Sequence, residues 1–348
     1  MTLTRGIPLF FELQKQTEPI NDRMGTMRET EIIEICKNMK KYRLRDKKTQ
    51  REVAEGRDGT EYICSERTYG KIERAVYVPK IEIIVKLLER FNTTLQEELE
   101  RVTRGSRVRF NNTVEGIGDL ILKRAYEEAT QTLEKLKKEI YYDRNLSINK
   151  QAILFLEGIL IYEIKKDAKK SIAYLINGMK LTRGGLFKGK GDKIDISQVE
   201  NNEYTLIEYK ILFNIAAKKD YLGKRGEGIE LSYAIIKSLM HENVEYRVRM
   251  RILQVTLFNL SNMLIDERRI DETIQVSTEG IEYCKELKTT KFIGGFYCNI
   301  AEAYMLKGDK GHAIEFFKRS EQHFIDEGEN QKAERTKTYA FESFGLSI

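Results

Sequence analysis

Apolar residues recur every three or four positions along most of the chain, and this spacing predicts amphipathic helices. A first helix is predicted over residues 29–42, and a second begins after Thr49, where Thr-Gln-Arg-Glu can form a capping box. Ser65 can cap a third helix over Glu66–Arg74. A fourth is predicted after Pro79, with Asn92 able to end it in the left-handed conformation, and a fifth, short helix after Thr94. The front of the chain is therefore expected to form a small helical domain.

After Ile117 the pattern changes to paired helices that recur at about forty residues, near the period of helix-turn-helix repeats. The clearest pair, over 296–320, resembles the tetratricopeptide pattern, and less regular copies surround Gly158, Phe213 and Phe258. Small residues at these points let two helices approach closely, so nearly all apolar and small positions are assigned to the core. The chain is predicted to be all-α, with a right-handed, tetratricopeptide-like helical solenoid behind the front domain.

Chain length and proline content favour two helical domains. The 348 residues exceed the usual size of one compact domain, and none of the three prolines lies after Pro79, which favours continuous helix. We expect an N-terminal extension over 1–27, a front domain over 28–105 and a repeat domain over 106–348.

No segment is expected to anchor the chain in a membrane or to direct its secretion. The longest apolar stretch, 152–162, is too short to span a bilayer, and Ile7–Phe11 is too brief for the apolar core of a secretory leader. The four cysteines form no CxxC pair and the three histidines are scattered, so neither a disulfide framework nor a metal site is predicted. We expect a cytoplasmic protein without a metal or other cofactor.

Basic charge is concentrated at the front of the chain. Residues 1–110 carry +5 of the total net charge of +6, and eight Lys or Arg residues from Lys37 to Arg51 are accompanied only by Asp46. Such a density attracts a polyanion such as a phosphate backbone, although a charge run by itself is usually a solvated surface.

Two segments of the front domain resemble the Xre/Cro-like helix-turn-helix of phage-repressor type. The first is Thr49–Ala54, and the second is Ser65–Arg74, whose closing Lys-Ile-Glu-Arg is similar to the family's Arg-Ile-Glu-Arg run. The resemblance implies binding to double-stranded operator DNA, with Arg67 donating two hydrogen bonds to a guanine. The residues that it places at base edges or phosphates are Lys48, Gln50, Arg51, Ser65, Glu66, Arg67, Thr68, Lys71 and Arg74.

The connection between these two segments departs from the usual pattern. Nine residues, Gly56–Cys64, replace a turn of about three or four, so they either loop outward and preserve the helix pair or change its angle. Ala75 also stands where a glycine usually follows the recognition helix, and Gly70 weakens the interior of that helix by roughly 1 kcal/mol.

Asn214, Asn259 and Asn299 recur at one position of three successive repeats, although Asn is a poor helix former. This position resembles the one that lines the concave groove of tetratricopeptide repeats, where an amide can bond to a peptide backbone. The predicted peptide-binding residues are Lys210, Asn214, Arg251, Asn259, Asn262 and Asn299, with Arg247 as a further basic residue. The alternative is that these asparagines bond to the backbones of neighbouring repeats.

The combined architecture, from Arg28 to Ser347, resembles the RRNPP family of peptide-responsive regulators. The resemblance implies a homodimer whose repeats bind a short signalling peptide and thereby change how two helix-turn-helix domains engage an operator. An apolar stripe over 331–344 suggests that the end of the array is covered either by a turn back onto the last repeat or by a second subunit. The second possibility for function is a repeat adaptor that binds another protein and keeps a vestigial front domain.

An enzyme is not predicted. Gly184–Lys190 has the spacing of a phosphate-binding loop, but Gly191 stands where Ser or Thr should bind magnesium. A predicted helix over 169–181 also precedes this loop in place of a strand. No Ser/His/Asp set or other nucleophile motif is recognisable.

Overall fold

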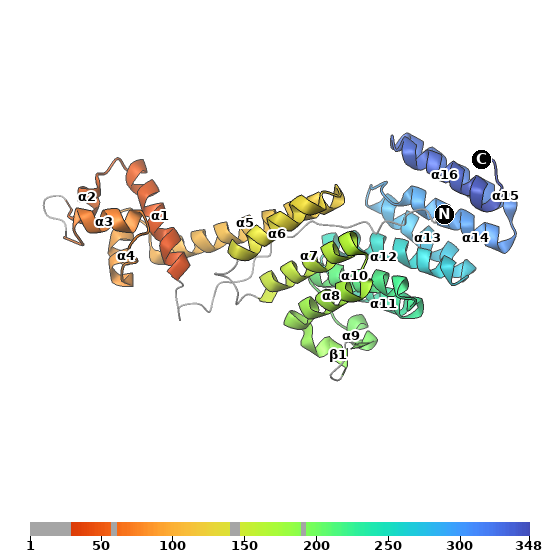
Figure 1. The fold of residues 1–348 in the computed structure, drawn as a ribbon, viewed down its shortest axis with the longest axis horizontal. Coiled ribbons are helices and arrows are strands. Elements are labelled where there is room, and N and C mark those ends of the chain that lie inside the picture. The colour runs from red at the N-terminus through yellow and green to blue at the C-terminus, as the bar shows by residue number, and fades with distance from the viewer. Residues whose placement is uncertain (1–28, 57–60, 140–146, 189–192) are drawn as a thin grey trace. The chain divides into compact units, whose positions relative to one another are not determined.

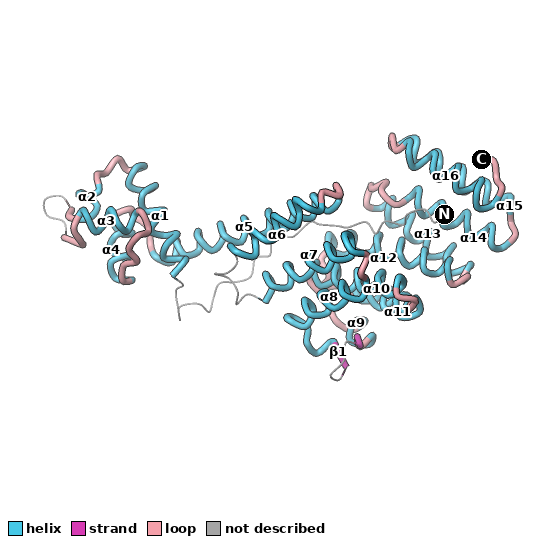
Figure 2. Tube along the Cα trace, viewed as in Figure 1, coloured by secondary structure: helices cyan, strands magenta, loops and turns pink. Residues whose placement is uncertain are grey.

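A computed structural model describes residues 29–56, 61–139, 147–188 and 193–348. Within them the chain is almost entirely helical, as the sequence predicts (Figures 1 and 2). It divides into two compact units between Val114 and Glu115, here named the front unit and the repeat unit. The predicted extension over 1–27 lies outside the described residues. None of the described helices is long and apolar enough to span a bilayer.

The front unit contains the helices expected of the helix-turn-helix resemblance. They are α1 (Glu29–Arg45), α2 (Gln50–Ala54), α3 (Glu66–Glu73), α4 (Ile81–Glu89) and the beginning of α5 (Leu95–Leu122). The predicted capping box at Thr49 and Glu52 is confirmed, and the Ser65 hydroxyl accepts a hydrogen bond from the Thr68 amide at the start of α3. The largest buried side chains of the core come from α1, α3 and α4: Ile35, Met39, Tyr69, Ile72, Ile84, Leu87 and Leu88.

The long connection between α2 and α3 closes on itself. The Ala54 carbonyl accepts hydrogen bonds from the amides of Ile63 and Cys64, at 3.0 and 3.2 Å. Both ends of the connection are thus held at one point, and α2 and α3 pack against each other. Residues 57–60, at its centre, lie outside the described residues.

A buried carboxylate fixes α3 against α1 and α2. Glu73 is 4% exposed and accepts hydrogen bonds from Arg43 Nε at 2.6 Å and from Gln50 Nε2 at 2.8 Å. Burial by itself raises the pKa of this carboxyl, but the bonds from Arg43 and Gln50 outweigh it and lower the pKa below its ordinary value. The charged pair therefore sets the orientation of the predicted recognition helix.

The chain leaves α3 and α4 through two left-handed residues. Ala75 has φ +54° and Asn92 has φ +52°. Asn tolerates this conformation, as the sequence predicts, whereas Ala carries a strain of about 1–2 kcal/mol in the position usually held by glycine.

The fifth helix is longer than the short one predicted. It begins with a reciprocal pair of bonds between Thr94 and Glu97 and continues for 28 residues, because no proline interrupts it. The fully buried Glu98 accepts from Asn38 Nδ2 at 2.8 Å, which ties the start of α5 to α1. The two compact units consequently divide at Val114, beyond the boundary at 105 that the sequence suggests.

The repeat unit is built from antiparallel helix pairs that stack on one another (Figure 1). The helices are α6 (Tyr126–Glu139), α7 (Ser147–Lys165), α8 (Ala168–Arg183), α9 (Ile196–Glu200), α10 (Leu206–Tyr221), α11 (Arg225–Leu239), α12 (Tyr246–Asp266), α13 (Ile270–Glu286), α14 (Ile293–Lys307), α15 (Lys310–Asp326) and α16 (Asn330–Phe344). The first helices of successive pairs, α10, α12 and α14, pack side by side. Gly294 permits one close approach, since a Cβ there would lie 2.6 Å from Phe324 Cζ.

The segment with phosphate-loop spacing has no such structure where it is described. After α8, Gly184–Leu186 forms the 3₁₀ turn η2, and β1 (Phe187–Lys188) pairs antiparallel with β2 (Lys193–Ile194). The preceding element is a helix, as predicted, and not a strand. Gly191 lies outside the described residues.

The end of the array is covered by its own chain. Ala333, Thr336 and Ala340 of α16 are buried, and Gly345 has φ +63°, which lets the tail turn back so that the Leu346 amide bonds to the Ala340 carbonyl at 3.1 Å. Leu346 is itself buried in this cluster. The turn-back alternative is confirmed, and the apolar stripe no longer requires a second subunit.

Candidate functional site

The exposed face of α3 and its C-cap residue carry cations that have no partner among the described residues. Arg67, Lys71 and Arg74 are exposed, and none of them makes a hydrogen bond or ion pair with another described residue. The opposite face is committed to the core through Tyr69 and Ile72. The core contacts therefore hold this helix in place with its positive charge facing outward. Such an arrangement suits contact with an anionic partner.

The side chains of three other predicted DNA contacts donate hydrogen bonds to groups of the protein itself. Lys48 Nζ donates to the Arg90 carbonyl at 2.6 Å, which satisfies the end of α4. Gln50 bonds to Glu73, as described above, and Arg51 Nε donates to Glu55 at 2.9 Å. The structure thus gives Lys48 and Gln50 roles in holding the front unit together, whereas the pair of Arg51 and Glu55 is an exposed contact between residues one helical turn apart.

The remaining predicted DNA contacts lie at the N-terminus of α3. Ser65 and Thr68 are partly buried and bond to one another, with 2.9 Å between their hydroxyl oxygens. The Glu66 amide donates to the Glu55 carboxylate at 3.2 Å, and the Glu66 side chain is exposed. The sequence analysis did not single out Tyr77, just after α3, which is 43% exposed.

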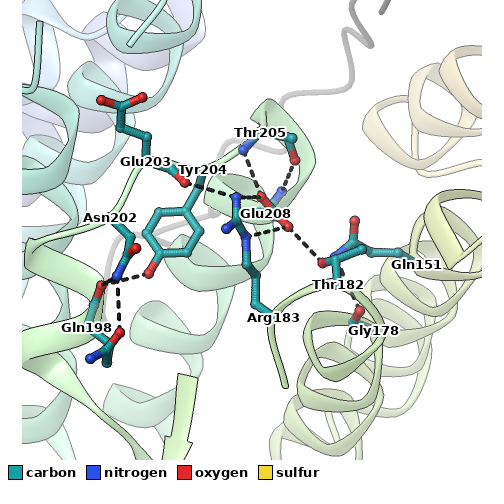
Figure 3. Close-up of polar contacts among 10 residues, drawn as sticks. All are labelled: Gln151, Gly178, Thr182, Arg183, Gln198, Asn202, Glu203, Tyr204, Thr205 and Glu208. Atoms are coloured by element: carbon teal, nitrogen blue, oxygen red, sulfur yellow. Dashed lines mark hydrogen bonds and ion pairs between the residues drawn. The ribbon is translucent and has the colours of Figure 1, made fainter. Parts of the chain in front are cut away.

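In the repeat unit, the position of α10 is fixed by the nearly buried Glu208 (Figure 3). Its carboxylate accepts from Thr182 Oγ1 at 2.7 Å and Arg183 Nε at 3.1 Å on α8, and from the Thr205 amide at 2.8 Å. Gln151 of α7 continues the network by donating to Thr182 at 2.7 Å. The three helices α7, α8 and α10 are thereby held in one orientation.

A polar line along α10 contains two predicted residues and one that sequence reasoning missed. Asn214 Nδ2 donates to the carbonyl of Lys210 at 2.8 Å, and Asn214 Oδ1 accepts from Lys218 Nζ at 3.0 Å. All three side chains are at most 3% exposed. Spacing by four residues is the signal that would have added Lys218 to the set.

Burial dominates the ionisation of both lysines on this line. It lowers the pKa of Lys210 to about 7, while the Glu115 carboxylate acts in the opposite direction. It also lowers the pKa of Lys218 to about 7, although that amine lies 4.7 Å from the centre of the Tyr162 ring. The α10 line is therefore a buried, weakly cationic row of side chains.

The three equivalent asparagines have different partners. Asn214 bonds within its own helix, as given above, and Asn299 of α14 donates to Ser261 Oγ at 2.6 Å and Asn262 Oδ1 at 2.9 Å on α12. Asn299 thus bonds to the neighbouring repeat, but to its side chains and not to its backbone. Asn259 differs from both, because its Nδ2 is buried and has no hydrogen-bond partner.

The neighbouring helix explains why Asn259 is left unpaired. Ser261 and Asn262, the partners of Asn299, stand two and three residues after Asn259, and the residues two and three after Asn214 are Ala216 and Ala217. Alanine offers no side-chain acceptor, so α10 cannot give Asn259 the bonds that α12 gives Asn299. A buried amide of this kind costs about 1–3 kcal/mol and is suited to a ligand carbonyl.

The basic residues predicted beside these asparagines are less informative. Arg251 is half-buried on α12. The side chain of Arg247 lies outside the described residues. Within the described residues, no three His, Cys, Asp or Glu side chains are grouped to hold a metal ion.

Comparisons with known proteins relate this fold to solved structures. No family model matches the sequence, and no curated protein matches it. PlcR from Bacillus thuringiensis in its apo form matches at a TM-score of 0.60 with 16% identity, over 87% of this chain and 98% of PlcR. PlcR in complex with the peptide PapR7 and DNA gives 0.51 and 18%, with the same coverage. The competence regulator ComR from Streptococcus vestibularis, in complex with its signaling peptide XIP, gives 0.50 and 12%, over 88% of this chain and 97% of ComR. The chain therefore has the fold that its resemblance to the RRNPP family implies, a helix-turn-helix unit followed by tetratricopeptide-like repeats.

Proposed function

We propose that the protein is a DNA-binding transcription regulator whose repeat unit binds a short signalling peptide. The observation that carries the proposal is the exposed face of α3, where Arg67, Lys71 and Arg74 have no partner among the described residues. Cations on the second helix of a helix-turn-helix are suited to base edges and phosphates. A repeat adaptor has no use for such a surface, so the adaptor function is not favoured.

The peptide-binding part of the proposal is supported by Asn259. Its buried amide, which has no hydrogen-bond partner among the described residues, would donate to a backbone carbonyl of an extended peptide. PlcR and ComR have both been solved with peptides, and PlcR also with DNA. By this proposal the protein is a regulator and not an enzyme, and it acts in the cytoplasm without a cofactor.

A homodimer is part of the proposal. One helix-turn-helix reads only a few base pairs, so two copies would bind half-sites about 34 Å apart, or a multiple of that distance. The apolar stripe of α16 does not support this dimer, because the chain's own tail covers it, although Phe341 is 63% exposed. Light scattering on the operator complex is expected to give the mass of the DNA plus twice the 40.7 kDa chain mass, and one chain per operator would rule out the dimer.

Selection of genomic DNA fragments by the purified full-length protein tests the proposal. We expect one reproducible palindromic site. Replacing Arg67 by Ala is expected to cost about 1–3 kcal/mol at that site and to relax the preference at one base pair, whereas Lys71→Ala lowers the salt slope by about one. Arg335→Ala, an exposed arginine on α16, is the matched control.

Two results would contradict the DNA-binding role. One is recovery of no common site, and the other is equal affinity of the Arg67→Ala and Arg335→Ala proteins for the selected DNA at low and moderate salt.

A further inference from the structure

A pocket of the repeat unit has no role in the function proposed so far. Its volume is about 470 Å³, and it lies where the turn between α7 and α8 meets the turn between α10 and α11. Tyr162, Lys166 and Lys169 line it on the α7–α8 side, and Tyr221 and Leu222 line it on the α10–α11 side. Small-molecule sites in proteins commonly have a volume of this order.

The pocket is open to solvent and presents an aromatic ring to it. Tyr221 is 52% exposed and Leu222 is 40% exposed, whereas Tyr162 is only 8% exposed. The rings of Tyr162 and Tyr221 lie 5.3 Å apart between their centroids and are tilted by 53°. Aromatic rings attract one another in tilted and offset arrangements, so the exposed ring of Tyr221 is suited to an aromatic ligand.

The lysines of the pocket favour an anionic ligand. The exposed side chain of Lys169 makes no hydrogen bond or ion pair with another described residue. Lys166 is exposed as well, and its Nζ lies 3.4 Å from the Glu163 carboxylate, longer than an ordinary N–H···O bond. Both ammonium groups can therefore turn toward a ligand carboxylate at little cost.

The carboxylates near the pocket already have partners. Asp167, which also lines the pocket, accepts from a backbone amide in the first turn of α8 at 2.8 Å. Glu163 accepts from the Tyr126 hydroxyl at 3.2 Å, and Asp220 pairs with Arg225 at 2.6 Å. The lysines of the pocket are thus only partly neutralised by the protein.

A buried cation behind Tyr162 adds to the positive charge. Lys218 Nζ lies 4.7 Å from the centre of the Tyr162 ring, and Lys166 Nζ lies 5.3 Å from it. Burial lowers the pKa of Lys218 most, and the charge of Lys166 lowers it further, because the two ammonium groups repel each other. An anion bound beside Lys166 would offset this repulsion.

We propose that this pocket binds a small aromatic carboxylate, with the ring of the ligand against Tyr221 and Leu222 and its carboxylate between Lys166 and Lys169. Hydrogen bonds between an ammonium group and a carboxylate are stronger than those between neutral groups, so the charge of the ligand would contribute to selectivity. The inference does not rest on the proposed function, because none of the predicted DNA-binding or peptide-binding residues lines the pocket.

The test uses the full-length protein and two probes of equal size, 2-naphthoate and the neutral 2-naphthamide. Calorimetry at pH 7 should show saturable binding of 2-naphthoate with a Kd of about 1 mM or lower, as expected for a ligand of this size. The affinity for 2-naphthamide should be at least about tenfold lower, because the amide cannot form charged bonds to the lysines.

Two variants of the pocket locate the site. Lys169→Gln and Tyr221→Ala should each lower the affinity for 2-naphthoate by about tenfold, whereas Lys169→Arg should retain it. The matched controls are Lys318→Gln on α15 and Tyr246→Ala on α12, which replace an exposed lysine and a 61% exposed tyrosine and should leave the affinity unchanged. All of these side chains are exposed, so the variants should fold.

Three results would overturn the inference: no saturable binding of 2-naphthoate, equal affinity for the two probes, or equal affinity of the pocket variants and their controls. DNA selection is independent of this assay. A selected operator together with any of these results would therefore reject the carboxylate site alone.

Discussion

The ion pair between Arg43 and Glu73 offers the sharpest test of how the front unit is held together. Glu73 is 4% exposed, and Arg43 donates to it through Nε at 2.6 Å and Nη2 at 3.2 Å. Replacing Arg43 by Met removes the charged partner of this carboxylate and leaves it buried beside the neutral donor Gln50 Nε2 at 2.8 Å. Breaking a buried pair from one side costs about 3–5 kcal/mol. That is a large part of the 5–15 kcal/mol that stabilises a typical domain.

A nearby surface pair provides the control. Arg45 donates to Asp46 at 2.7 Å, but its side chain is 60% exposed, and exposed pairs contribute about 0–1 kcal/mol. Urea unfolding of the full chain at pH 7 should therefore show a large loss for Arg43→Met and almost none for Arg45→Met. Adding Glu73→Leu to the Arg43→Met protein should recover most of the loss, because no buried charge then remains.

The pH dependence supplies a second readout. In the unaltered protein the pKa of Glu73 is lowered, so its contribution is present above the unfolded-state pKa and is lost as pH falls through the folded value. Without Arg43, burial dominates and raises the pKa, so the folded state takes up the proton first and the deficit of Arg43→Met should shrink from pH 7 toward about 4.5. A deficit that stays constant over this range, or equal losses for both arginine variants, would refute the reasoning.

Three further outcomes are expected. Ala75→Gly should raise the free energy of unfolding of the front unit by about 0.5–1 kcal/mol in urea titrations. Glycine relieves the strain at φ +54°, and this gain exceeds the extra entropy that glycine loses on folding. A lower free energy of unfolding would show that the strain is absent. Asn299→Ala should lower the melting temperature of the repeat unit by about 2–6 °C in calorimetry, because two hydrogen bonds to α12 disappear, and an unchanged value would exclude the packing role. The pKa of Lys218 is about 7 in the folded chain and higher in the unfolded one, so the unfolded chain binds more protons above pH 7 and the free energy of unfolding should rise toward pH 9. Lys218→Met should reduce that rise in urea titrations at several pH values. An identical pH profile would contradict a lowered pKa of Lys218.

Local features of this chain were predictable from the sequence. The capping residues Thr49 and Ser65 and the left-handed Asn92 act within a turn of where they stand, so their neighbours in the chain suffice to predict them. The same holds for the small and aromatic positions of the repeats, because each pair of helices must pack against the next with a fixed period. The all-α architecture and the helix-turn-helix could therefore be predicted from the sequence.

Only the tertiary structure decided which polar side chains remain available to a partner. Asn214, Asn259 and Asn299 are equivalent in sequence, yet one bonds to its own helix, one has no partner and one bonds to the next helix. The difference comes from residues some forty positions away, alanines on α10 and Ser261 with Asn262 on α12. Lys48 and Arg67 likewise look alike as basic residues near a predicted helix, but only folding brings the Arg90 carbonyl to Lys48 and leaves Arg67 without a partner among the described residues. A hydrogen bond depends on which group lies within about 3 Å, and groups distant in sequence are brought that close only by packing.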